Sequence, residues 1–126
     1  MNKIITALIS IIALLHVYIA WFEIFAWESR GPKVFASFPA DLFAQTTAMA
    51  ANQGLYNAFL AVGLIWSLLI TDRDWRANVA TMFLLFVAVA GIFGAATVSP
   101  SIFVVQTVPA AIALAFIFIS KKRSAT

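Results

Sequence analysis

The chain contains no cysteine and only one histidine, His16, among its 126 residues. Without cysteine, disulfide bonds, thiol chemistry and thiolate metal sites are excluded. A metal site also needs three or four ligands, which one histidine and few carboxylates do not supply, so we expect no metal. A haem would find one axial ligand in His16 and no attachment motif. We therefore expect no cofactor.

Charged residues are also scarce. They make up 10% of the chain, whereas a soluble domain carries about a quarter. Hydrophobic residues make up 63%, which favours a bilayer. The net charge is +3, but the basic residues gather at the ends of apolar segments, as in membrane topology. We therefore expect membrane lipids as the surroundings and no binding of nucleic acid.

Four apolar segments are long enough to cross the membrane, since about 30 Å of hydrocarbon takes about 20 helical residues. These predicted spans lie at about 4–27, 48–70, 77–98 and 100–120. We expect Asp74 to cap the third span, and Ser99 and Pro100 to begin the fourth. The sequence thus predicts an all-α integral membrane four-helix bundle that forms one domain over 1–126.

The basic residues are divided unequally between the two sides that four spans would define. Six accompany the two termini and the loop at 71–76, whereas only Arg30 and Lys33 lie on the other side. Because cytoplasmic loops carry an excess of Lys and Arg, we expect both termini in the cytoplasm. The expected location is the cell inner (plasma) membrane, with several crossings.

The external loop at 28–47 is the longest loop of the predicted topology. Pro39 and Asp41 suit the first turn of a helix, so we expect a helix to start near Pro39. We interpret this helix as one that could run unbroken into the second span.

Polar residues lie at similar depth in several spans, in the outer half of the predicted membrane. In the first span, Glu23 lies about one turn below Trp27, and His16 lies about 10 Å deeper. Gln106 lies about two turns from the outer end of the fourth span. Amides need partners in hydrocarbon, so we predict an outward-opening polar pocket centred on Glu23. In the second span, spacings of three and four suggest one shared helix face for Asn52, Gln53, Tyr56 and Asn57.

Glu23 is the strongest functional signal, because an ionisable residue inside a span is a functional hypothesis by default. The alternative is that Glu23 reaches water, or that it binds Gln53 or Asn57 only to hold the helices together. A lone His16 more often bonds a neighbouring helix than takes part in chemistry. We name Glu23 and His16 as candidate catalytic residues, and the candidate ligand-binding residues are Asn52, Gln53, Tyr56, Asn57, Gln106 and Trp27.

The order of these residues resembles a known family. His16, Glu23 and Trp27 are followed by KVF at 33–35, NQGLYN at 52–57 and FLAVGL at 59–64. This pattern is similar to that of small prokaryotic membrane proteins catalogued as the domain of unknown function with the number thirteen hundred and four. The resemblance covers most of the chain. It implies a four-helix membrane protein and selects His16, Glu23 and the polar residues of NQGLYN, but it implies no activity.

Three functions fit these observations. The first is binding of a small or amphipathic molecule, with acid–base catalysis by Glu23 left open. The second is proton-coupled transport of a small molecule through Glu23, which the unequal charge distribution and the apolar cytoplasmic half disfavour. The third is a structural or accessory subunit that packs its polar residues against a partner, and a homo-oligomer is also left open. We favour the first.

Overall fold

The computed structural model describes residues 3–124, and these form six α-helices and one π-helix, with no strand among them. The prediction of an all-α protein is therefore confirmed. The long helices are α1 (Lys3–Phe25), α4 (Thr47–Leu69) and α5 (Arg73–Thr97). The last helix, α6 (Val108–Ser124), directly follows the π-helix η1 (Phe103–Thr107). Two short helices, α2 (Trp27–Val34) and α3 (Ala40–Gln45), lie between α1 and α4.

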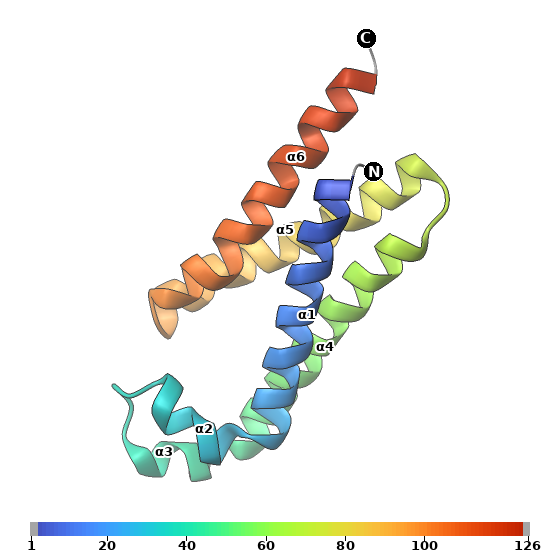
Figure 1. Cartoon of the computed structure of the whole chain (residues 1–126). Helices are drawn as coiled ribbons and strands as arrows, with labels where there is room; N and C mark the ends of the chain where they lie inside the picture. Colours follow the sequence, from blue (N-terminus) through green and yellow to red (C-terminus); the bar gives the residue numbers. More distant parts are fainter. Residues whose placement is uncertain (1–2, 125–126) are drawn as a thin grey trace.

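The long helices pack in a ring. Helix α1 packs along α4, α4 packs on α5, α5 packs on η1 and α6, and α6 returns to contact α1. The start of α1, the end of α6 and the turn between α4 and α5 lie at one end of the molecule, whereas α2 and α3 lie at the other (Figure 1). We call these the terminal end and the capped end.

An apolar core fills the molecule toward the terminal end. On α1 its members are spaced three and four apart, as residues on one helix face are. Large apolar side chains elsewhere on the same helix are exposed, with Leu14 at 68% and Phe25 at 77%. An apolar exterior of this extent suits lipid rather than water. The core consists of Ile5, Ile9, Ile12, Ala13, Leu64, Ala80, Leu84, Val87, Ala110, Ala113 and Ile117.

Three helices of the described chain are long and apolar enough to cross a membrane: Lys3–Phe25, Arg73–Thr97 and Phe103–Arg123. Helix α4 has 23 residues, as many as α1, but it does not belong to this group. Three amides, Asn52, Gln53 and Asn57, lower its hydropathy. The structure thus supports a membrane protein with three helices of spanning character, and the crossing of α4 stays a prediction.

Two helix starts differ from the predicted ones. Helix α5 begins at Arg73 and is capped by Asp72, whose Oδ1 accepts a hydrogen bond from the Trp75 amide at 2.7 Å. The cap therefore lies two residues before the expected Asp74, because Asp72 has the extended backbone of a cap, whereas Asp74 is in the first turn of the helix.

The fourth segment does not begin as a regular helix. The Ser99 hydroxyl pairs with Ser101 at 2.9 Å, and the chain then enters the π-helix η1. The Val108 amide donates to the Phe103 carbonyl, five residues back. Because Pro109 has no N–H, the regular bond to the carbonyl four residues back is missing next to this turn. A π-turn beside a proline is a recognised local solution.

The capped end also differs from the prediction. A helix starts beside Pro39 as predicted, since Pro39 is the N-cap of α3, but it does not run unbroken into the second span, because α3 ends at Gln45 and α4 begins at Thr47. In addition, α2 runs through Gly31 and Pro32, within the predicted external loop at 28–47. Gly31 is buried under the Phe43 ring, and a Cβ there would collide with it. This contact packs α2 on α3.

Candidate functional site

The Glu23 side chain is half-buried and bridges α1 and α4. Its Oε2 accepts a hydrogen bond from Asn57 Nδ2 at 2.8 Å. The same amide nitrogen donates to the Gln53 carbonyl at 3.2 Å, so both Asn57 protons are used. Within residues 3–124, the Asn57 bond is the one polar contact of the carboxylate, and Oε1 is left for another donor.

Gly54 allows this close contact between the two helices. A Cβ at Gly54 would lie 2.7 Å from Ile24 Cγ1 and 3.0 Å from the Ala20 carbonyl oxygen. Real Cβ atoms do not pack so closely, so only glycine fits here without a shift of α1. The position of the Glu23–Asn57 pair therefore depends on a glycine one turn above it on α4.

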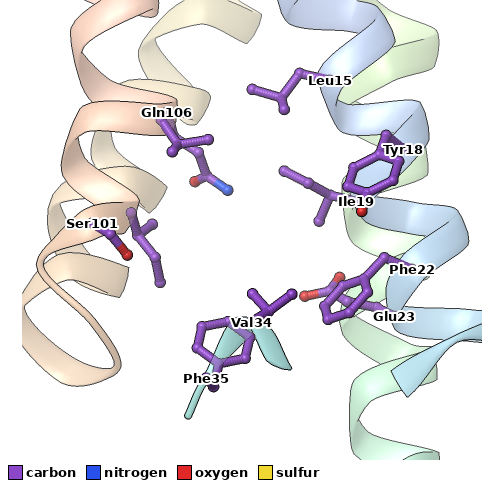
Figure 2. Close-up of a pocket in the computed structure, with 11 residues that line it drawn as sticks. Leu15, Tyr18, Ile19, Phe22, Glu23, Val34, Phe35, Ser101 and Gln106 are labelled. Carbon is purple, nitrogen blue, oxygen red and sulfur yellow. The ribbon is translucent and has the colours of Figure 1, made fainter. Parts of the chain in front are cut away.

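Glu23 also faces a cavity of about 210 Å³. In Figure 2 its carboxylate and the Gln106 amide point into the cavity from opposite sides. Tyr18 is 46% and Val105 44% exposed, so the cavity opens to the outside of the molecule. The walls come from α1, the end of α2, and the segment that leads into η1. They consist of the apolar Leu15, Ile19, Phe22, Val34, Phe35, Ile102 and Val105 and the polar Tyr18, Glu23, Ser101 and Gln106.

The π-helix positions Gln106. It packs tightly on α5 at Gly91, where a Cβ would lie 2.8 Å from the Thr107 amide nitrogen and 2.9 Å from Gln106 Cβ. Thr107 is buried, and its hydroxyl donates to the Ala88 carbonyl at 3.0 Å. These contacts fix the backbone at Gln106 and Thr107.

Trp27 supports the wall of the cavity without lining it. Its Nε1 donates to Thr46 Oγ1 at 2.9 Å, which links the start of α2 to the start of α4. Its ring packs against Phe22, Phe35 and Phe43, with centroids 5.7, 5.9 and 5.2 Å away. These contacts hold Phe35 against the cavity.

The remaining predicted site residues lie elsewhere. Asn52 Nδ2 donates to the Tyr56 hydroxyl at 3.2 Å, and both side chains are exposed, as is Gln53. The expectation that the amides of α4 form one cluster with Glu23 therefore holds for Asn57 and is wrong for the side chains of Asn52 and Gln53. The reason for Asn52 is geometric: it lies five positions from Asn57, and five positions along a helix correspond to a rotation of about 140°.

His16 is fully buried and is not among the lining residues. Its Nδ1 lies 2.8 Å from the Ile12 carbonyl, which can only accept, so Nδ1 carries the proton. The other ring nitrogen, Nε2, has no hydrogen-bond partner among the described residues. The same part of the chain contains no group of three metal-ligating side chains.

Several lining residues were missed by reasoning from polarity. Leu15, Tyr18, Ile19 and Phe22 flank Glu23 at helical spacing on α1, a signal that could have indicated a shared wall. Phe35 follows the end of α2 and Ser101 lies just before η1, and their approach to α1 depends on the packing of α2 and η1, for which the sequence has no local signal.

The comparisons with known proteins support one assignment. A family model described as "Protein of unknown function (DUF1304)" matches residues 10–118. This range includes every residue that lines the cavity. The searches of curated proteins and of solved structures yield no match.

Proposed function

Because the chain belongs to the family described as "Protein of unknown function (DUF1304)", which its sequence pattern predicted, we propose a function from the geometry of the site. The protein binds a small amphipathic molecule in the cavity between α1, the end of α2 and η1. The observation that carries this proposal is the position of two polar groups, Glu23 and Gln106, on opposite walls of a cavity with otherwise mainly apolar sides.

The proposal places this cavity in the outer half of a membrane. Helix α4 has 23 residues, about 35 Å of helix, which suffices to cross about 30 Å of hydrocarbon. It packs along α1, and its Asn57 amide is satisfied by Glu23 and its own backbone. We therefore propose that α4 crosses together with the three apolar helices. Six basic residues at the terminal end favour a cytoplasmic position for both termini.

The size and chemistry of the cavity favour an amphipathic ligand. Its 210 Å³ corresponds to about seven water molecules in the liquid, enough for a small molecule or for the head of a larger one. Binding sites commonly combine apolar walls with a few polar groups that orient the ligand. An exposed rim allows an apolar tail to extend into the lipid.

Binding is favoured over transport because of the core. Toward the terminal end, the space between the helices is filled by apolar side chains that are almost fully buried, among them Ile9, Leu64 and Leu84. Proton-coupled transport would need a path through this region. The open cavity also favours a ligand over an accessory role, for which a filled interior is expected.

Two neighbouring residues of α1 offer a matched test. Leu15 lines the cavity, whereas Leu14 is 68% exposed. We expect native mass spectrometry of the protein, purified in a mild non-ionic detergent, to detect a bound small molecule. Leu14→Trp should retain this molecule, and Leu15→Trp should lose it because the indole fills the cavity. Retention by Leu15→Trp, or a wild-type protein that carries no molecule from its own membranes, would contradict the proposal.

A further inference from the structure

We infer that the molecule bound in this cavity is a lipophilic cation, specifically a substituted ammonium ion whose charge lies between the Glu23 carboxylate and neighbouring aromatic rings. The inference rests on the proposed function, because it assigns a chemical class to the ligand of the same cavity. Three features of the walls support it: their charge, their aromatic rings and their apolar surface.

When Glu23 is ionised, the lining is negative and carries no basic residue to compensate it. Glu23 is the one ionisable carboxylate of the lining, and no Lys, Arg or His is among the lining residues. Its polar contact within the described chain comes from the neutral Asn57 amide. A carboxylate inside a membrane requires a counter-charge or a proton. A cationic ligand supplies the counter-charge, whereas a neutral ligand leaves the carboxylate to take up a proton, and an anionic ligand is repelled by the ionised form.

Three aromatic residues, Tyr18, Phe22 and Phe35, line the same cavity as the carboxylate. The Phe22 and Phe35 centroids are 6.5 Å apart, and Tyr18 lies one turn along α1. Figure 2 shows the Glu23 carboxylate between the Phe22 ring and the segment that carries Val34 and Phe35. Ring faces attract a cation within about 6 Å of the centroid, and aromatic cages recognise substituted ammonium groups in this way. The walls thus suit a positive charge that is covered by alkyl groups.

Arg30 contacts the lining residue Tyr18 but is not itself part of the lining. Arg30 is exposed, and its guanidinium lies 5.3 Å from the Trp21 ring and donates to the Tyr18 hydroxyl at 3.2 Å. It forms no ion pair with Glu23 within residues 3–124. Because Arg30 is exposed, solvent and salt screen its repulsion of a ligand cation.

The test compares two probes of equal shape. Benzyltrimethylammonium is a cation, and neopentylbenzene is its neutral isostere with carbon in place of nitrogen. Binding of each to the full chain in nanodiscs of neutral lipid is measured by saturation-transfer NMR, with empty discs subtracted. We expect the wild type to bind the cation at least about tenfold more tightly than the isostere.

Two glutamates provide the matched variants. Glu23→Gln should remove the preference for the cation and leave binding of the isostere unchanged. Glu28→Gln, which alters an exposed carboxylate at the start of α2, should keep the preference. The inference would be overturned if the wild type bound both probes with equal affinity, and this comparison needs no variant. A preference that survives Glu23→Gln would also overturn it.

The outcomes also separate this inference from the proposed function. If the wild type binds both probes equally and Leu15→Trp loses both, the cavity binds amphipathic molecules without selecting cations. The inference then fails and the proposed function stands. If the wild type binds neither probe, the inference fails, and the comparison of Leu14→Trp with Leu15→Trp by mass spectrometry decides the proposed function separately.

Discussion

Replacing Gly91 by alanine should force α5 away from the π-helix that carries Gln106. The new Cβ would lie 2.8 Å from the Thr107 amide nitrogen, whereas ordinary contacts start near 3.4 Å. The backbone of η1 must therefore move by about 0.6 Å, because a backbone atom cannot rotate aside as a side chain does. The Thr107 hydroxyl would also collide, which removes its bond to Ala88. Overpacking costs about 1–3 kcal/mol, and a lost bond between membrane helices costs about 0.6 kcal/mol.

Gly94→Ala is the matched control on the same helix. Its Cβ would approach the Ile102 Cγ2 atom at 3.0 Å, and this side-chain end can move. Both substitutions gain the same helix propensity, about 1 kcal/mol, so the gain cancels in the comparison. We expect Gly91→Ala to be less stable than Gly94→Ala by about 2 kcal/mol. The measurement is reversible unfolding by SDS in mixed micelles, followed by far-UV circular dichroism. Equal unfolding free energies would refute the close packing of η1 on α5.

Two further predictions concern the Glu23 contact and the topology. Asn57→Leu should lower the free energy of unfolding by about 1–2 kcal/mol in the same assay, because the Glu23 carboxylate loses its donor. The control, Asn52→Leu on the exposed face, should change this free energy by less than about 0.5 kcal/mol. Equal effects of the two substitutions would argue against the Glu23–Asn57 pair. Because the chain has no cysteine, single-cysteine variants react with maleimide at one known position. In intact cells, Ser37→Cys should react with a membrane-impermeant maleimide and Thr71→Cys only after permeabilisation, and the reverse pattern would overturn the proposed orientation.

Local sequence patterns predicted the helices well because long apolar runs with charged ends have few alternatives. The predicted pairing of Glu23 with an amide of α4 is present through Asn57. The spacings of three and four did not identify the amide that pairs with Glu23. Each spacing of three or four residues shifts the direction of the side chain slightly, and successive shifts move it around the helix. Asn52 and Asn57 therefore face different directions, although spacings of three and four link the polar residues between them.

The parts that the sequence did not predict depend on contacts between distant segments. Gly31 and Pro32 favour a turn, but the packing of Phe43 on Gly31 accommodates a helix there. The π-helix has a local cause in Pro109, yet its close approach to α5 requires Gly91 on another helix. Because these contacts position the end of α2 and η1, the walls that come from these two elements could be identified only in the folded chain.

The most direct test of the binding site is an experimental structure of the protein in lipid nanodiscs at a resolution that separates ligand from side chains. We predict non-protein density in the cavity, with its polar end between the Glu23 carboxylate and the Gln106 amide and its apolar part along Leu15 and Val105. A cavity closed by protein side chains, or one that holds only water between Glu23 and Gln106, would contradict the proposal.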